Sequence, residues 1–84
     1  MVEPIFKEND YIINPSSGDM AIVGGVTKRN YYTFKAYYGH MFRRLKDVKD
    51  NTYDLQVNYQ KFYRLCTDEE KKKLDDIIKN AQEG

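Results

Sequence analysis

Residues 28–46 of the chain read KRNYYTFKAYYGHMFRRLK, and this stretch decides the predicted fold and function. It holds six of the twelve aromatic residues (eight Tyr and four Phe in all) and six of the fourteen Lys and Arg residues, with no acidic residue. Within it, residues 31–38 are rich in Tyr, Thr and Phe, which favour a pleated, half-buried strand. The stretch therefore predicts a long strand that carries a basic and aromatic surface.

Alternation along this strand divides its side chains into two sets, because successive side chains point to opposite faces of a sheet. One predicted face carries Tyr32, Phe34, Ala36 and Tyr38, and the other carries Tyr31, Thr33, Lys35 and Tyr37. We expect Tyr31 and Tyr37 to be exposed to solvent beside Lys35.

Two earlier segments complete the first half of the sheet. Residues 10–14 (DYIIN) predict a short strand, which ends at the turn-forming residues 15–19. Residues 20–27 (MAIVGGVT) predict a second strand, which forms a hairpin with the long strand across 28–30. The pair Gly24-Gly25 indicates a bulge or a sharp bend. A phosphate-cradling loop would need a following Gly-Lys-Ser/Thr, which this chain lacks.

The next segment allows more than one assignment. Residues 41–48 are compatible with a strand or with a helical turn. Residues 53–59 (YDLQVNY) alternate between apolar and polar types and predict a strand. Its inward residues would be Tyr53, Leu55, Val57 and Tyr59. Residues 60–66 would continue as an extended or irregular link. The alternative is a helix whose apolar face is formed by Leu55, Tyr59, Phe62 and Leu65.

The C-terminal segment predicts a helix over 67–82. Thr67 and Glu70 have the spacing of a capping box, in which each side chain accepts a hydrogen bond from the backbone N–H of the other residue. Apolar residues then recur at i, i+3, i+4 and i+7, namely Leu74, Ile77, Ile78 and Ala81. Because a helix this short is marginal alone, we expect it to plug an open end of the sheet or cover a face.

These segments predict a single domain over 1–84, with an arm (1–9), a β-barrel or sheet (10–66) and the helix (67–82). The predicted fold class is α+β, mainly β: a small SH3-like barrel or a strongly curved antiparallel sheet of four to five strands, with one C-terminal α-helix. Eighty-four residues leave too little chain for a second core.

Charge and cysteine content indicate the environment. The net charge is +1, but the balance is −3 over 1–25, +5 over 26–50 and −1 over 51–84, so the middle third is a basic island. The single cysteine allows no intramolecular disulfide and suits a reducing compartment. The first residues lack the basic end and apolar run of a signal peptide, and no window approaches about 18 apolar residues. We therefore expect a cytoplasmic protein without a membrane partner.

Two stretches resemble small accessory proteins of bacteriophages and prophages of gut bacteria: FKENDYIINPSSGDMAIV at 6–23 and FYRLCTDEEKKKL at 62–74. Those proteins open with a hydrophobic-Lys-x-Gly/Asn-Asp strand and close with an Arg-Leu-Ala-Thr-x-Glu-Glu-Lys helix start. The matching residues of the closing pattern are Arg64, Leu65, Thr67, Glu69, Glu70 and Lys71, and Cys66 replaces the usual Ala. The resemblance covers about a third of the chain. It implies a phage-type origin, a small β-barrel and the host cytoplasm, and it carries over no activity.

The chain offers little for catalysis or metal binding. His40 and Cys66 are its single His and Cys, and Cys66 lies in an apolar context typical of a small buried residue. Structural zinc needs four Cys or His ligands, and Asp47, Asp50 and Asp54 lack the Gly and closing Glu of a calcium loop. We therefore predict a protein that is not an enzyme and that has no metal and no cofactor.

A ligand-binding surface is the remaining candidate. Tyr rings stack on bases and Lys or Arg side chains contact phosphates in sequence-tolerant single-strand binders. The candidate ligand-binding residues are Lys28, Arg29, Tyr31, Lys35, Tyr37, Arg43, Arg44 and Lys46. The alternative interpretation is that these Tyr side chains pack the two sides of a strand and that the basic residues are ordinary solvated surface.

Two functions follow from this surface. The first is a small non-enzymatic module, of phage type, that binds an anionic ligand, either a nucleic acid or a nucleotide. The second is a phage counter-defence inhibitor or adaptor, for example of the anti-CRISPR kind, that docks on a host protein through the same Tyr and Arg residues. A salt titration separates them, because phosphate contacts weaken steeply with salt. The oligomeric state is left open.

Overall fold

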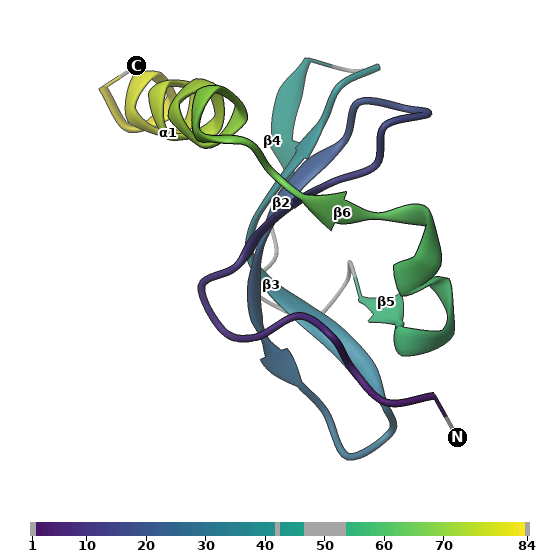
Figure 1. Cartoon of the computed structure of the whole chain (residues 1–84). Helices are drawn as coiled ribbons and strands as arrows, with labels where there is room; N and C mark the ends of the chain where they lie inside the picture. Colours follow the sequence, from purple (N-terminus) through teal and green to yellow (C-terminus); the bar gives the residue numbers. More distant parts are fainter. Residues whose placement is uncertain (1, 42, 47–53, 84) are drawn as a thin grey trace.

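The computed structural model describes residues 2–41, 43–46 and 54–83. Over these residues the chain folds as an antiparallel sheet of six strands followed by one helix (Figure 1). In chain order the elements are β1 (Tyr11–Ile13), β2 (Met20–Val26), β3 (Tyr31–Gly39), β4 (Arg44–Lys46), β5 (Leu55–Gln56), the 3₁₀ helix η1 (Val57–Phe62), β6 (Arg64–Leu65) and α1 (Asp68–Glu83). The predicted α+β, mainly β, class is confirmed, with one strand more than the predicted four to five.

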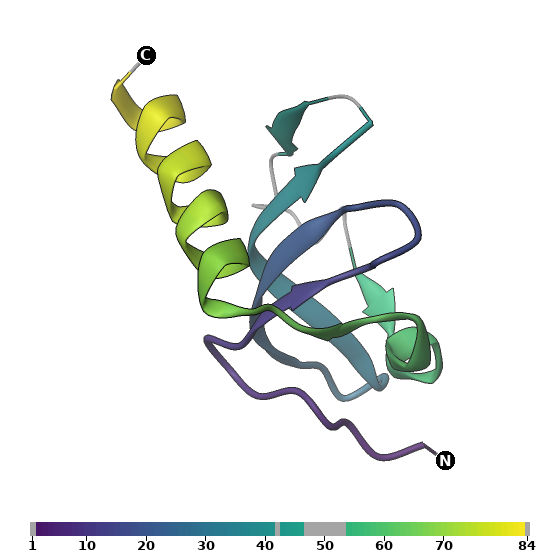
Figure 2. The same cartoon turned by 45° about the horizontal axis from the view of Figure 1, so that its top comes forward.

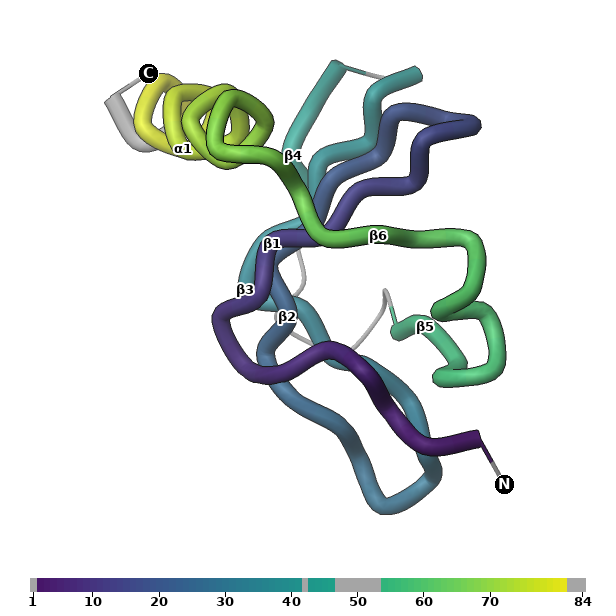
Figure 3. Tube along the Cα trace, viewed as in Figure 1, coloured from purple at the N-terminus to yellow at the C-terminus, as the bar shows by residue number. Residues whose placement is uncertain are grey.

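The sheet is strongly curved but open. Its strands lie in the order β4-β3-β2-β1-β6, so the last strand pairs with the first. β5 pairs with the beginning of β3 and β4 pairs with its end. Figure 3 shows these strands coiling around one interior. Over the described residues no pairing joins β6 to β4 or β5, so the sheet does not close into a barrel. Of the two alternatives for 41–48, the strand is observed at Arg44–Lys46.

A bulge on β3 changes which of its side chains face the interior. The β2–β3 pairing skips Lys35, between Phe34 and Ala36. An extra residue shifts the alternation of side chains by one position. Phe34 and Tyr37 therefore pack on the same interior cluster, whereas Tyr38 packs on the opposite face. The predicted division into two continuous faces is thus wrong beyond Lys35.

A second bulge lies at the glycine pair of β2. The pairing skips Gly24 and resumes between Gly25 and Thr33, which confirms the predicted interruption of this strand. A Cβ atom at Gly24 would lie 3.0 Å from Oγ1 of Thr33, and Gly25 has a φ of +152°. Side chains would be strained at both positions, so the bulge that bends the hairpin depends on glycine.

Each face of the sheet carries an apolar cluster. The interior cluster contains Phe6, Ile12, Ala21, Val23, Tyr32, Phe34 and Val57, with Tyr37, Leu55 and Tyr63 packed against it. The cluster on the opposite face contains Ile13, Met20, Tyr38, Cys66 and Leu74, with Tyr11, Ile22, Leu45, Ile77 and Ile78 packed against it. Figure 2 shows α1 lying along the sheet, where it covers this second face. The prediction that the helix covers a face of the sheet is confirmed.

The N-terminal arm is fixed by a buried polar pair. The Tyr32 hydroxyl donates to Oε1 of Gln60 and accepts the backbone N–H groups of Ile5 (3.0 Å) and Phe6 (3.2 Å). Oε1 of Gln60 also accepts from the N–H of Ile5 (3.0 Å), and Nε2 donates to the carbonyl of Glu3 (2.8 Å). Phe6 is buried, whereas Ile5 is 63% exposed. The arm therefore packs along the sheet through the side chain of Phe6.

Helix α1 begins at the predicted capping box. The N–H of Glu70 donates to Oγ1 of Thr67 (3.2 Å), and the N–H of Thr67 donates to Oε1 of Glu70 (2.8 Å). Arg64 adds two parallel hydrogen bonds to the Glu70 carboxylate, at 2.8 and 2.9 Å. These bonds, with the Arg64 ones contributing most, lower the pKa of Glu70 to about 2. Among the described residues, no helix is long and apolar enough to cross a membrane.

The strand predicted over 53–59 is wrong after its first residues. Tyr53 lies outside the described residues, and Leu55–Gln56 form β5. Val57–Phe62 form the 3₁₀ helix instead. Tyr59, which was expected to point inward, is 49% exposed.

The three-residue repeat of the 3₁₀ helix explains this change. It turns Val57 and Gln60 inward, where both are buried. Tyr59 and Phe62 are also three residues apart and lie on the exposed side. The helical alternative was therefore closer in element type, but three of the four residues of its proposed apolar face are exposed, and only Leu55 packs against the interior cluster. Phe62 and Leu65 are 53% and 55% exposed, respectively.

Candidate functional site

The candidate site lies at the turn between β2 and β3. The N–H of Asn30 donates to the carbonyl of Thr27 (3.0 Å), and the N–H of Thr27 donates to the carbonyl of Tyr31 (2.8 Å). Asn30 has a φ of 64°, a left-handed conformation that Asn tolerates better than most residues. This closed turn holds Lys28 and Arg29 at its tip, where both side chains are exposed.

Asn30 also fixes the turn to two other segments. Its carbonyl accepts the N–H of Val57 at 3.0 Å, and its side-chain amide donates to the carbonyl of Val2 at 3.0 Å. The start of η1 and the N-terminal arm are therefore bound to the turn. A site built here rests on three segments that are far apart in the sequence.

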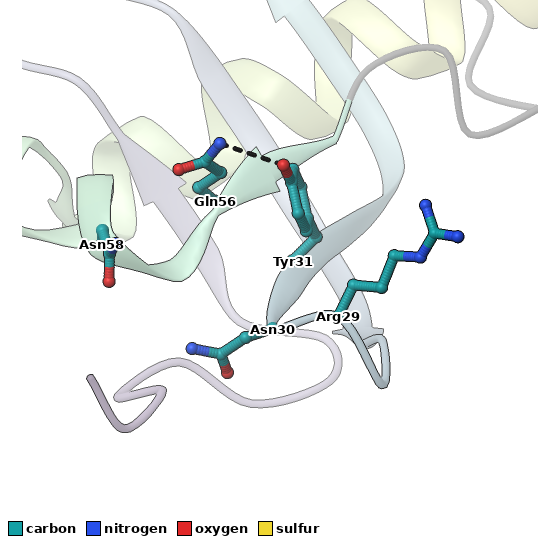
Figure 4. Close-up of a pocket in the computed structure, with 5 residues that line it drawn as sticks. All are labelled: Arg29, Asn30, Tyr31, Gln56 and Asn58. Atoms are coloured by element: carbon teal, nitrogen blue, oxygen red, sulfur yellow. Dashed lines mark hydrogen bonds between the residues drawn. The ribbon is translucent and has the colours of Figure 1, made fainter. Parts of the chain in front are cut away.

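Two pockets share Arg29 and Tyr31. The first has a volume of about 350 Å³ and is lined by Arg29, Asn30, Tyr31, Gln56 and Asn58 (Figure 4). The second has a volume of about 470 Å³ and is lined by Thr27, Lys28, Arg29, Tyr31 and Asp54. Both volumes fall within the range of small-molecule sites, about 300–1,000 Å³. Because the pockets share two residues, they are adjacent.

Tyr31 is held at the centre of this site. It pairs with Gln56 in the β3–β5 register, and Nε2 of Gln56 donates to the Tyr31 hydroxyl at 2.9 Å. Figure 4 shows Arg29 on one side of the Tyr31 ring and the amides of Asn30, Gln56 and Asn58 on the other side. The ring is half-buried, so its position is fixed while part of its surface stays accessible. An aromatic ring, amides and a guanidinium-bearing side chain thus line the same pocket.

The charge of the site is positive. Lys28 and Arg29 form no ion pair with any residue that the structure describes. Asp54 is the one acidic side chain in the two pocket linings. A negatively charged ligand could therefore bind two basic side chains that form no ion pair with a described carboxylate.

Lys35 belongs to a different contact. Its Nζ lies 3.1 Å from Oε2 of Glu8 and 2.6 Å from Oδ1 of Asn9. It is four residues from Tyr31, which corresponds to about 13 Å along a strand. The bulge residue therefore fastens the end of the arm to β3, and an acidic neighbour offsets its charge.

Tyr37 packs against the interior cluster. Its hydroxyl donates to Oδ2 of Asp19 at 2.9 Å, and the other oxygen of that carboxylate accepts the N–H of His40 at 2.9 Å. Burial, followed by the neighbouring Tyr63 and Asp19, raises the pKa of Tyr37 well above its ordinary value. Nζ of Lys46 lies 5.6 Å from the centre of the Tyr37 ring. The expected exposure of Tyr37 is observed only in part, because its ring is half-buried, and Asp19 links its hydroxyl to the backbone of His40.

The remaining basic candidates lie at the far end of β3. Arg44 pairs with Gly39 and Lys46 pairs with Tyr37, while Arg43 lies in the preceding turn. The two ends of β3 are roughly 26 Å apart for nine extended residues. The structure therefore brings together Lys28, Arg29 and Tyr31, and it places Arg43, Arg44 and Lys46 elsewhere.

Sequence reasoning missed the amide groups of the site. Asn30 was interpreted only as a turn residue, and Gln56 and Asn58 only as the outward positions of a strand. All three residues are polar, and polarity alone does not distinguish a site residue from ordinary surface. Gln56 and Asn58 reach Tyr31 only through the pairing of β5 with β3 and the hydrogen bond between Val57 and Asn30, which the sequence does not reveal.

The described residues contain no group of three or more His, Cys, Asp and Glu side chains able to hold a metal ion. Cys66 is buried beneath the helix, and burial raises the pKa of its thiol to about 11. The thiol is therefore protonated near neutral pH and is a poor nucleophile.

No family model, curated protein or solved structure matches this chain. The site is therefore interpreted from its own geometry and chemistry.

Proposed function

We propose that this chain is a small non-enzymatic binding module that engages an anionic ligand, a nucleic acid or a nucleotide, at the pockets around Arg29 and Tyr31. The observation that carries the proposal is the position of Arg29, which forms no ion pair with any described residue, beside the half-exposed ring of Tyr31. Charge-assisted hydrogen bonds make guanidinium groups good phosphate ligands, and tyrosine rings stack on bases of any sequence. Asn30, Gln56 and Asn58 add donors and acceptors for the polar edges of a base.

The proposal ranks the eight candidate residues. Lys28, Arg29 and Tyr31 form the primary site. Lys35 and Tyr37 are expected to act on stability, since their polar groups are bonded to other parts of the protein. The distant group around Arg43 and Arg44 would contribute long-range attraction, which salt screens within about 10 Å at 0.1 M.

The test compares two double variants of the same chemical type. Lys28→Ala with Arg29→Ala should weaken binding of a fluorescein-labelled oligothymidylate at least tenfold in fluorescence anisotropy. It should also lower the slope of log affinity against log salt by about 1.4, at roughly 0.7 per phosphate contact. Arg43→Ala with Arg44→Ala is the matched control and should change the affinity less. An equal or larger loss in the control would place the site at the other end of β3.

A second candidate function is the inhibitor or adaptor that docks on a host protein. It is favoured by the exposed apolar side chains of Ile5, Tyr59, Phe62 and Leu65. Aromatic-centred protein interfaces depend weakly on salt, whereas phosphate contacts depend steeply on it. Capture of a protein from nuclease-treated host lysate, with retention insensitive to salt, would favour this function over nucleic-acid binding.

We also propose that the curved, open sheet is of SH3-like type, and we propose a phage-type origin and the host cytoplasm for this protein. The position of β6 beside β1 supports a barrel-like course of the chain. Asn9 of the opening motif has a φ of 73°, which gives a physical reason for Gly or Asn at that position. Thr67 and Glu70 of the closing motif form the helix cap. A search for the gene in phage or prophage genomes tests the origin.

A further inference from the structure

Two aromatic side chains form an exposed stack on η1. The rings of Tyr59 and Phe62 are inclined by 25° with centroids 6.2 Å apart. Their exposed fractions are 49% and 53%, although packing in a small protein normally buries such side chains. The three-residue repeat of the 3₁₀ helix aligns them on one side. The structure thus presents a ready aromatic platform to solvent.

This platform continues the pocket site along the chain. Asn58 lines the first pocket, and the N–H of Val57 is bonded to the carbonyl of Asn30 in the turn. Tyr59 follows directly after Asn58 and is about 6 Å from Gln56 along the axis of a 3₁₀ helix, at roughly 2 Å per residue. A strand of a few nucleotides spans that distance.

The platform also carries a positive charge. Nζ of Lys61 lies 5.3 Å from the centre of the Phe62 ring, and Lys61 forms no ion pair with any described residue. A surface made for an apolar protein partner would have its cations at the rim, because charged residues are depleted from the core of an interface. Alternating aromatic and basic groups are instead the arrangement that single-stranded nucleic acids bind.

From these features we infer that Tyr59 and Phe62 form a second base-stacking site, and that the ligand is a single-stranded nucleic acid of several nucleotides. The strand runs from the Tyr31 pocket along η1, with one base on Tyr31, a later base on the Tyr59–Phe62 platform and a phosphate beside Lys61. This inference rests on the proposed function, which a mononucleotide would satisfy equally well.

Two fluorescein-labelled probes of different length test the inference, an eight-residue and a two-residue oligothymidylate. The wild-type protein should bind the longer probe more tightly. Tyr59→Leu with Phe62→Leu keeps apolar side chains but removes the rings. It should weaken binding of the longer probe by about 5- to 150-fold and change binding of the shorter probe less than about twofold. Unchanged melting temperatures establish that the variants fold.

Three further variants separate base stacking from non-specific apolar contact and test the phosphate contact of Lys61. Leu65→Ala truncates an exposed apolar residue near the platform and should leave both affinities unchanged. Lys61→Gln should lower the salt slope for the longer probe by about 0.7, and Lys79→Gln on the solvent face of α1 should not.

The results distinguish the two proposals. Three outcomes would overturn the second stacking site. They are equal affinity for the two probes, unchanged affinity in the variant Tyr59→Leu with Phe62→Leu, and an equal loss of affinity in Leu65→Ala. The pocket proposal would then stand if Lys28→Ala with Arg29→Ala still weakens binding of the shorter probe. If neither probe binds the wild-type protein, both proposals are overturned. If the protein instead captures a host protein, independently of salt, and Leu65→Ala abolishes that capture, the platform belongs to a protein-binding surface.

Discussion

Gln60 is the one buried polar side chain among the described residues, and the N-terminal arm depends on it. A buried amide is costly unless its donor and acceptor are both bonded. Here the oxygen accepts from Tyr32 and Ile5, and the nitrogen donates to the carbonyl of Glu3. No described buried side-chain nitrogen or oxygen lacks a hydrogen-bond partner. Gln60 therefore binds the arm without leaving an unsatisfied group in the interior.

The variant Tyr32→Phe tests this contact. It removes the hydroxyl that accepts from Phe6 and leaves that backbone N–H without its partner. We expect a loss of about 1–3 kcal/mol in the free energy of unfolding, measured by urea denaturation, because an unpaired buried polar group costs that much. The control Tyr31→Phe removes an exposed hydroxyl from the same strand and should cost under about 1 kcal/mol. Equal losses in the two variants would contradict this role of Tyr32.

At the level of elements, the start of α1 is the most strongly specified boundary. Thr67 and Glu70 form the cap, and Arg64 from β6 binds the same carboxylate. The cap thus joins the last strand to the helix. An acidic group in the first helical turn also interacts favourably with the helix dipole.

The pH dependence of stability should report this cap. The folded pKa of Glu70 is about 2, below the ordinary value of roughly 4.3, so its contribution is complete above about pH 5 and is lost as the pH falls toward 2. Glu70→Gln should lower the free energy of unfolding by about 1 kcal/mol at pH 7, and the difference from wild type should shrink as the pH falls from 5 toward 2. Glu69→Gln removes the same charge from a residue that does not bind Arg64, and it should lower the free energy of unfolding by less. A difference that persists unchanged at pH 2 would exclude the carboxylate as its source.

Elements with a redundant local signal were predictable from sequence. The first three strands, the glycine bulge and the helix cap each combine residue type, spacing and turn chemistry. The bulge at Lys35 had no such signal. Because Tyr37 and Tyr38 are adjacent aromatic residues, either could face the interior, and the pattern looks the same with or without the extra residue.

The 3₁₀ helix was missed for a related reason. Alternating apolar and polar residues over 53–59 imitate a strand, and the inward position of the helix at 60 is a glutamine rather than an apolar residue. Its burial depends on Tyr32 and on the arm, which are distant in the sequence. Only tertiary structure could therefore reveal that Gln60 faces inward and that Tyr59 is exposed.

In the whole molecule, one thin sheet separates two small apolar clusters, and each is completed by a segment from one end of the chain. Phe6 of the arm belongs to the interior cluster, and Leu74 of α1 belongs to the opposite one. A small domain has a total stability of only about 5–15 kcal/mol. The burial of Phe6 and of Leu74 is therefore expected to supply a substantial part of the stability.

The variant Leu74→Ala tests the contribution of the helix. Leu74 is fully buried between α1 and the sheet, so its truncation should cost about 2–5 kcal/mol in thermal or urea denaturation. Leu65→Ala makes the same substitution at an exposed position and should cost under about 0.5 kcal/mol. A cost below 1 kcal/mol for Leu74→Ala would show that the helix is not a necessary part of the core.

The site could be predicted only in part, and the reason lies at this scale. The basic and aromatic stretch contains Lys28, Arg29 and Tyr31, which are close in sequence and lie together at one turn. The full set of eight residues follows a strand whose ends are roughly 26 Å apart, so these residues do not line one pocket. The amides at Asn30, Gln56 and Asn58 join the pocket through pairing between distant segments.

The hydrogen bond between Val2 and Asn30 has a practical consequence for anyone who handles this protein. Asn30 lines the pocket, so whatever is attached ahead of Val2 emerges at the rim of that pocket. An affinity handle or fluorescent fusion placed there would obstruct the ligand and imitate a loss-of-function variant. Figure 1 shows the far end of α1 on the other side of the molecule, which makes the C-terminal side the suitable place for a label.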